Sequence, residues 1–232
     1  MKNKNTKNIN VYILSKKSQD KDALWETTKS KYKTMMPTLI SSLEDYISAS
    51  GKANRDERIF SAILILQSLP SLAFFDPKSP PRELKKDFNG KPNFDGSDVG
   101  ISIAHNEHFV IVGYGEKTEI GVDIECEISQ ERAEKLEKRF PQISAMKTEK
   151  ADEKVNVFKM QANGEIEPLE LTPAHDSFTA KWTAAEAAMK CDGRGFSALP
   201  ELEKIKVKTK IFTLVFESEN GKEYISVAIT KK

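Results

Sequence analysis

The segment Ile120–Glu125, with the sequence IGVDIE, constrains the fold of this chain more than any other stretch. Its alternating apolar residues predict a β-strand, in which residues two apart point to the same face. Asp123 and Glu125 therefore project side by side, and they repel each other unless a proton or a cation lies between them. Two interpretations stay open here: a divalent-metal site, or a solvated strand face at a sheet edge. Gly121 suits a position where a ligand or another backbone comes close.

Length and composition exclude several classes of protein. The chain has 232 residues, 38% of them hydrophobic, enough for the core of one large domain or two small ones. A net charge of +1 argues against bulk electrostatic binding to nucleic acid. The N-terminus lacks the apolar core of a signal peptide, and the longest apolar run, 62–75, is too short and too interrupted to span a bilayer. Cys126 and Cys191 form neither a disulfide framework nor a zinc spacing. We therefore expect a reduced, soluble, cytoplasmic protein that binds no nucleic acid and no membrane.

The first third predicts a strand followed by helices. A strand is expected over Ile9 to Leu14, then helical sequence over 20–49 that breaks at Pro37, because an internal proline removes a hydrogen bond. Apolar residues at helical spacing predict another helix over 55–69. Arg58 lies in its first turns, where a cation gains nothing from the helix dipole. Taken alone, Arg58 is interpreted as a solvated side chain.

Three short strands are expected next, after a proline-rich connector and a glycine-containing turn. They cover 99–105, 109–114 and 120–125, and their close spacing predicts a β-meander in which neighbouring strands pair antiparallel. His105 ends the first of them beside a turn, a usual location for a residue that contacts a ligand. His108 and His175 have no partner at metal-ligand spacing and are interpreted as surface residues.

The second half mixes helices and hairpins. The irregular stretch 147–176 is interpreted as an insertion of low functional content. The expected elements are a helix over 129–140, a hairpin of 155–160 with 166–171, a helix from 177 to 193, and a hairpin of 205–216 with 224–229.

The helix that starts near Ser177 carries two stripes. A buried stripe is expected at Phe178, Trp182, Ala185 and Met189. Thr183, Glu186 and Lys190 share the neighbouring stripe. Glu186 and Lys190 are four residues apart in the favourable order, so by themselves they predict a surface ion pair worth a few tenths of a kcal/mol.

Together, these segments resemble the 4′-phosphopantetheinyl transferase family. The chain carries, in the family's order, GKP at 90–92, SIAH at 102–105, IGVDIE at 120–125, WTAAEAAMK at 182–190 and GRG at 193–195. The strand motif and the Trp-x-x-x-Glu-x-x-x-Lys helix are together specific, whereas GKP and the histidine corroborate them. The resemblance covers about residues 87–196. In length the chain resembles the long, single-chain group named for the surfactin-synthetase activator.

The resemblance implies an α+β fold of two similar α/β subdomains in a pseudo-twofold arrangement, each with an antiparallel sheet and packed helices. Residues 1–117 would form the N-terminal subdomain, on the nucleotide side of the coenzyme A site. Residues 118–232 would form the C-terminal subdomain, with the metal-binding acids and the catalytic helix. A monomer is expected, because one chain supplies both halves of the site.

The activity implied by the resemblance is Mg²⁺-dependent transfer of the phosphopantetheine arm of coenzyme A to a serine of an acyl or peptidyl carrier protein, releasing 3′,5′-ADP. The pathway stays open among fatty-acid, polyketide and nonribosomal peptide synthesis. The implied metal ligands are Asp123, Glu125 and Glu186, the catalytic residues Glu186, Lys190 and His105, and the coenzyme A contacts Arg58, Lys91, His105 and Lys190.

The chemistry of these residue types agrees with that assignment. Mg²⁺ prefers a few carboxylates together with waters and substrate phosphates. A serine hydroxyl needs a base, and Glu186, directly or through a metal-bound water, is the best-placed candidate. Lys190 would offset the charge that builds on the departing ADP.

The chain also departs from the family pattern. Ala185 stands where the family usually has lysine, Ala104 where it has serine, and the interval from Glu125 to Glu186 is longer than usual. Two other classes stay open: a non-catalytic descendant that binds coenzyme A or a carrier protein, and another metal-dependent phosphoester enzyme such as a nucleotide hydrolase. The hydrolase class usually needs a second metal or a histidine cluster.

Overall fold

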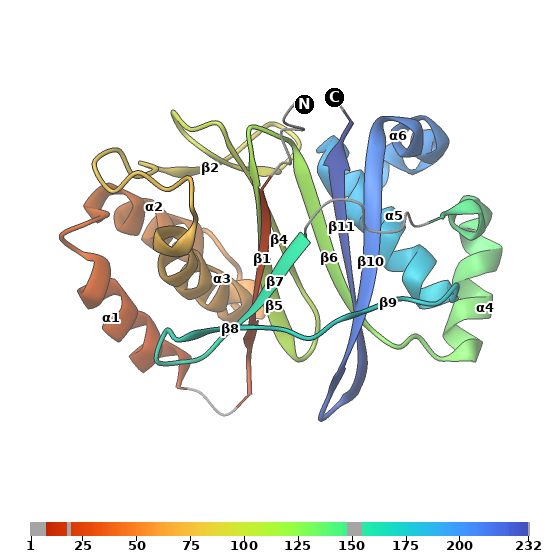
Figure 1. The fold of residues 1–232 in the computed structure, drawn as a ribbon, viewed down its shortest axis with the longest axis horizontal. Helices are drawn as coiled ribbons and strands as arrows, with labels where there is room; N and C mark the ends of the chain where they lie inside the picture. The colour runs from red at the N-terminus through yellow and green to blue at the C-terminus, as the bar shows by residue number, and fades with distance from the viewer. Residues whose placement is uncertain (1–7, 18–19, 148–154, 232) are drawn as a thin grey trace, which may run out of the picture.

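Two packed sheets with helices on their outer sides form the body of the molecule (Figure 1). The structure, a computed structural model, describes residues 8–17, 20–147 and 155–231. Within these ranges it contains six α-helices and sheets of five, four and two strands, which makes the chain α+β as expected.

The larger sheet has the strand order β4-β5-β1-β7-β8, with β1 antiparallel to β5 and parallel to β7. Along β1, Val11 and Ile13 face the other sheet, while Tyr12 and Leu14 pack against helices, so both faces of this strand are buried. The strands are β1 (Ile9–Ser15), β4 (Val99–His105), β5 (Phe109–Glu116), β7 (Val155–Met160) and β8 (Ile166–Pro168). The helices that cover the outer face are α1 (Lys21–Tyr32), α2 (Pro37–Ser48) and α3 (Arg55–Ser68).

The four-stranded sheet is antiparallel throughout, in the order β6-β11-β10-β9. Its strands are β6 (Ile120–Cys126), β9 (Thr172–Pro173), β10 (Thr209–Ser218) and β11 (Gly221–Thr230). The helices on its outer side are α4 (Gln130–Arg139), α5 (Phe178–Asp192) and α6 (Leu202–Lys208). A separate two-stranded ribbon consists of β2 (Leu84–Lys86) and β3 (Pro92–Phe94).

Most locally encoded elements are confirmed. The expected break at Pro37 is present, because this proline opens α2 at a position that needs no backbone N–H. The hydroxyl of Ser129 caps α4, and Gly193 ends α5 in the left-handed region at φ 92°. The hairpin of β7 and β8 is also confirmed.

The predicted meander is wrong in its third strand. β4 and β5 pair antiparallel, but β6 pairs with β11 in the other sheet. Lys117, at φ 50°, turns the chain out of the first sheet. β6 then packs across the face of β5, where Gly113 leaves room for the side chain of Val122. The start of the last hairpin is also later than expected, because Leu202 and Ile205 are buried at helical spacing in α6.

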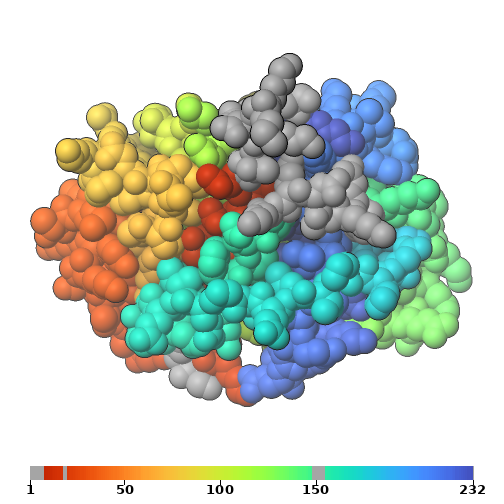
Figure 2. Space-filling view, viewed as in Figure 1, coloured from red at the N-terminus to blue at the C-terminus, as the bar shows by residue number. Residues whose placement is uncertain are grey.

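The stretch interpreted as an insertion contributes to both sheets. β7 and β8 extend the larger sheet, and β9 pairs with β10. Figure 2 shows residues 155–176 crossing one face of the molecule over both halves. Residues 148–154, within the same stretch, lie outside the described residues. The division into subdomains at residues 117 and 118 stays a prediction.

No helix in the described ranges combines the length and the apolar character needed to cross a bilayer.

Candidate functional site

The structure brings four of the predicted site residues together where β6 meets α5. Asp123 and Glu125 lie on the face of β6 that packs against this helix, and Glu186 and Lys190 lie one turn apart on α5. The ammonium group of Lys190 donates to Asp123 Oδ1 at 2.6 Å, so its ion-pair partner lies on the strand, not one turn away at Glu186. Charged groups from two distant segments therefore form one cluster.

Gly121 allows this close approach of helix and strand. A Cβ atom at this position would lie 2.9 Å from Cys191 Cα and still closer to the carbonyl oxygen of Ala187 and the backbone nitrogen of Cys191. Of the two alternatives left open by the sequence, a ligand or a backbone, the structure shows the backbone of α5. The absence of a side chain at residue 121 thus determines how closely α5 packs against β6, and therefore against Asp123.

Asp123 is buried, which contradicts the solvated-face interpretation of this residue. Its exposed fraction is 3%. Oδ1 accepts from Lys190, whereas the buried Oδ2 has no hydrogen-bond partner among the described residues, unless the neighbouring carboxyl group of Glu186 is protonated and donates to it. A buried carboxylate oxygen without a partner is costly, and such an atom in a native protein calls for an explanation such as an ion.

The pKa values of the surrounding groups indicate a deficit of positive charge. Burial, followed by repulsion from Asp123, raises the pKa of Glu186 to about 8. The same two causes, in the same order, raise the pKa of Glu125. Burial of Lys190 lowers the pKa of its ammonium group, but the negative charges of Asp123 and Glu186 raise it by more, so the pKa of Lys190 is raised overall. Three carboxyl groups with a single ammonium, and one unused buried oxygen, form a donor set that fits Mg²⁺.

The elevated pKa of Glu186 predicts a pH-dependent stability in the absence of divalent metal. Between the ordinary value of 4.5 and about 8, the unfolded chain has lost the Glu186 proton while the folded chain retains it. The free energy of unfolding should therefore fall as pH rises through this window, by up to about 1.4 kcal/mol per pH unit, and level off above it. Glu186→Gln removes this proton and should flatten the profile. Urea denaturation of both proteins from pH 5 to pH 9 in a chelator would check it, and parallel profiles would contradict the assignment.

A second group of predicted residues lines a small cavity of about 260 Å³ next to this cluster. Arg58 donates to the carbonyl oxygen of Tyr46 and lies over the Tyr46 ring at 4.8 Å, so it is not the solvated side chain expected from the sequence. Lys86, on β2, lies over the same ring at 5.5 Å. His105 and Glu57 also line the cavity.

The charges of this cavity favour an anion. Neither Arg58 nor Lys86 forms an ion pair with any carboxylate that the structure describes. Loss of solvent, together with repulsion from Arg58, lowers the pKa of Lys86. A phosphate group would offset the repulsion between these two cations, because its oxygens can accept hydrogen bonds from both. Lys86 was missed from the sequence, because only the fold places β2 beside α2, whose Tyr46 ring contacts both Lys86 and Arg58.

His105 links the cavity to the acidic cluster. Loss of solvent lowers the pKa of its ring, and the charges of four neighbours modulate that shift. These neighbours lie on both sides: Glu57 and Lys16 toward the cavity, and Asp123 and Lys190 in the acidic cluster. One extended, phosphate-bearing ligand could therefore contact both.

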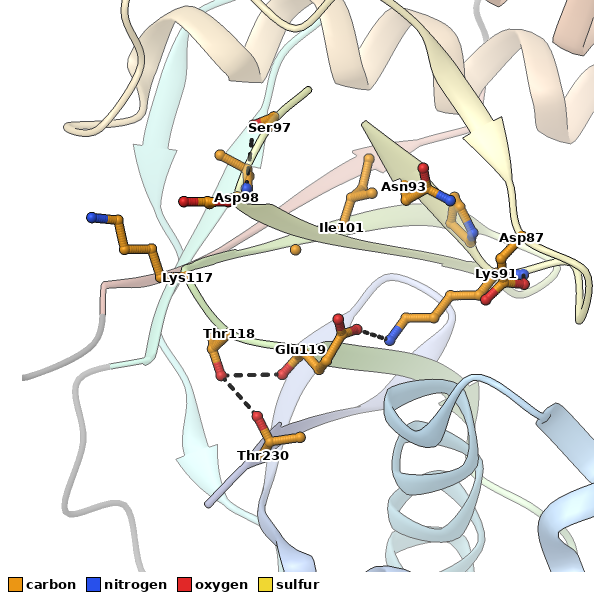
Figure 3. A pocket seen from close by; sticks show the side chains of 13 residues that line it. Asp87, Lys91, Asn93, Ser97, Asp98, Ile101, Lys117, Thr118, Glu119 and Thr230 are labelled. Carbon is orange, nitrogen blue, oxygen red and sulfur yellow. Dashed lines mark hydrogen bonds and ion pairs between the residues drawn. The ribbon is translucent and has the colours of Figure 1, made fainter. Parts of the chain in front are cut away.

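Lys91 does not line the cavity that contains His105 and Arg58. Its ammonium group pairs with Glu119 (Figure 3). It also donates to the carbonyl oxygen of Cys191 at 2.9 Å, so it connects the glycine turn to the end of α5. Lys91 lines a larger cavity of about 720 Å³, whereas its neighbour Gly90 lines the Arg58 cavity. The turn that carries Lys91 therefore separates the two cavities.

The two family positions occupied by alanine are both buried. Ala185 is 0% exposed in the core beneath α5, and Ala104 is 3% exposed between the sheets. Neither position lines the small cavity that contains Arg58 and His105.

No protein-family model matches the chain, and no curated protein matches it in sequence.

Proposed function

We propose that this chain is a Mg²⁺-dependent 4′-phosphopantetheinyl transferase, which moves the phosphopantetheine arm of coenzyme A to a serine of an acyl or peptidyl carrier protein and releases 3′,5′-ADP. The observation that carries the proposal is the convergence of Asp123, Glu125 and Glu186 with Lys190, beside a cavity with two cations. Acids that hold a metal and cations that hold phosphates are the two components this reaction needs.

In this proposal, Asp123, Glu125 and Glu186 hold Mg²⁺. The ion, when bound, would neutralise the pyrophosphate and stabilise the charge that develops on it. Arg58, Lys86 and His105 bind the phosphate groups on the nucleotide side, and Lys91 fixes the turn beside them.

Glu186 accepts the proton of the carrier serine, directly or through a water. The pKa of Glu186 near 8 applies to the metal-free protein. A Mg²⁺ ion beside this carboxyl group would lower its pKa and keep it ionised, the form in which it accepts a proton. Lys190 stabilises the charge on the departing 3′,5′-ADP, and its pairing with Asp123 keeps the ammonium group in the cluster.

The proposal includes the fold and setting expected from the resemblance. The subdomains 1–117 and 118–232 would form the pseudo-twofold 4′-phosphopantetheinyl transferase fold, as a cytoplasmic monomer. Two observations support this: the two sheets carry helices on their outer sides, and one chain supplies the residues of the candidate site, from α3, β2, β6 and α5. Neither Cys126 nor Cys191 forms a disulfide bond, as a reducing compartment allows.

Mass spectrometry of a carrier protein tests the transfer. Apo acyl and peptidyl carrier proteins are incubated with coenzyme A, Mg²⁺ and this protein. A phosphopantetheine adduct is expected on each accepted carrier. It should be absent when the acceptor serine is replaced by alanine or when a chelator removes the metal. Coenzyme A binding in calorimetry without an adduct on any carrier would reject the transferase in favour of a non-catalytic binding protein.

The 3′-phosphate of coenzyme A gives a sharper prediction for Arg58. Arg58→Gln should raise KM for coenzyme A by about 10-fold to 100-fold with little change in kcat, because the contact is made equally before and during the reaction. With dephospho-coenzyme A, which lacks this phosphate, wild type and variant should have similar KM values.

Arg55→Gln is the matched control, since Arg55 lies on the same helix and pairs with Asp22 on the exposed surface. An equal loss with both coenzyme A forms would mean that Arg58 does not contact the 3′-phosphate.

A further inference from the structure

A second cluster of ligand-type side chains lies at one end of the interface between the two sheets. His108 comes from the turn between β4 and β5, Cys126 ends β6, and Glu223 lies on β11. One ligand atom from each lies within 4.8 Å of the other two. Sequence spacing offers His108 no ligand partner, whereas the fold places it, half-buried, within reach of Cys126 and Glu223.

We propose that His108, Cys126 and Glu223 bind a transition-metal ion of the Zn²⁺ type. Thiolate, imidazole and carboxylate are the three ligand types that Zn²⁺ takes in proteins, and three protein ligands leave a fourth position for water. Zn–S and Zn–O bonds of about 2.3 and 2.1 Å at a tetrahedral angle separate the two ligand atoms by about 3.6 Å. Cys126 Sγ and Glu223 Oε1 already lie 3.8 Å apart.

The charge of Glu223 supports a cation at this position. The residue is 0% exposed and forms no ion pair with a lysine or arginine in the part of the chain that the structure describes. Glu223 accepts hydrogen bonds from Asn106, Cys126 and Ser218, but these donors are neutral and leave its negative charge without a counter-charge. A divalent ion shared with a thiolate would supply that counter-charge.

Asn106 fixes the positions of two of the three ligands. Its Oδ1 accepts from the backbone nitrogens of His108 and Phe109, both at 2.9 Å, which orders the turn that carries His108. Its Nδ2 donates to Glu223 Oε2 at 2.7 Å and leaves Oε1 on the side of Cys126. Groups that orient ligands in this way are characteristic of metal sites.

The cluster is distinct from the acidic site on the same strand. Side chains alternate along β6, so Asp123 and Glu125 face α5, while Cys126 faces the other sheet with Ile124. The ligand chemistry differs as well, because an all-oxygen site suits Mg²⁺, whereas a thiolate and an imidazole select Zn²⁺-type ions. An ion here would connect the β4–β5 turn to β6 and β11, and so join the two sheets.

Cobalt spectroscopy tests the site without reference to transferase activity. Metal-free protein is titrated with Co²⁺ in excess Mg²⁺, which occupies the acidic site. Wild type should develop a thiolate-to-cobalt charge-transfer band in the near ultraviolet, and Zn²⁺ should abolish it by displacement. Binding is expected to release the thiol proton of Cys126.

Four variants assign the ligands. Cys126→Ser should remove the band. His108→Gln should weaken Co²⁺ binding at least about 10-fold, since replacing even a residue that only orients a ligand typically lowers metal affinity about 10-fold to 100-fold. Cys191→Ser and His175→Gln are the matched controls and should retain wild-type binding. Zn²⁺ should also raise the melting temperature of wild type but not of Cys126→Ser. No charge-transfer band in wild type, or a band that persists in Cys126→Ser, would overturn the proposal.

Discussion

Asp123→Asn should reduce phosphopantetheine transfer by about 1,000-fold or more while the protein remains folded. One oxygen of Asp123 holds Lys190, and the other is the buried atom that lacks a donor among the described residues. Asparagine has nearly the same shape but removes the charge that pairs with Lys190 and that, in the proposed function, binds Mg²⁺. It also removes a repulsion that raises the pKa of Glu186, so loss of the fold is not expected.

The measurement is the rate of adduct formation on a carrier protein, together with Mg²⁺ binding by calorimetry. Asp95→Asn is the matched control, because Asp95 pairs with Lys85 at 3.0 Å on the exposed surface, away from the site. The control should retain wild-type values for both readouts. A rate for Asp123→Asn within tenfold of wild type, or unchanged Mg²⁺ binding, would remove Asp123 from the metal site.

Gly121→Ala should lower the free energy of unfolding by about 3 kcal/mol or more, the range found for severe overpacking. The new methyl group would overlap the backbone of α5 at Ala187 and Cys191, and backbone cannot move aside as a flexible side chain can. To make room, α5 would have to move away from β6. Glu186 and Lys190 would then move away from Asp123, so transfer should fall together with stability.

Urea denaturation of the metal-free protein measures this effect. Gly51→Ala is the control, since Gly51 has φ −66° and no atom within 4 Å of the added methyl group. It should be neutral or stabilising by about 0.4–1 kcal/mol, because alanine restricts the unfolded chain. A loss below about 1 kcal/mol for Gly121→Ala would show that α5 does not depend on this close contact.

The sequence predicts those parts of the molecule that short-range physics determines. Pro37, Ser129 and Gly193 mark helix ends, because proline geometry, hydroxyl capping and a left-handed residue act within one turn. The hairpin of β7 and β8 has the same local origin. The grouping of Asp123 with Glu125 also follows from strand alternation alone.

Long-range pairing could not be predicted in this way. β6 follows β5 closely in the chain, yet its partner is β11, about a hundred residues later, because its apolar face packs across β5. The same limit applies to side chains. Lys190 pairs with Asp123 on the strand, and His108 meets Glu223 across the two sheets. Helical or metal-ligand spacing cannot reveal neighbours that belong to different elements.

The position of β1, between β5 and β7, has a consequence for synthesis of the chain. β1 is made well before its parallel neighbour β7, which begins only at residue 155. Until then, one edge of β1 has unsatisfied N–H and C=O groups, and such an edge is a template for pairing with other chains. A nascent or truncated chain that stops before β7 should therefore be prone to aggregation, and addition of the residues through β8 should suppress it.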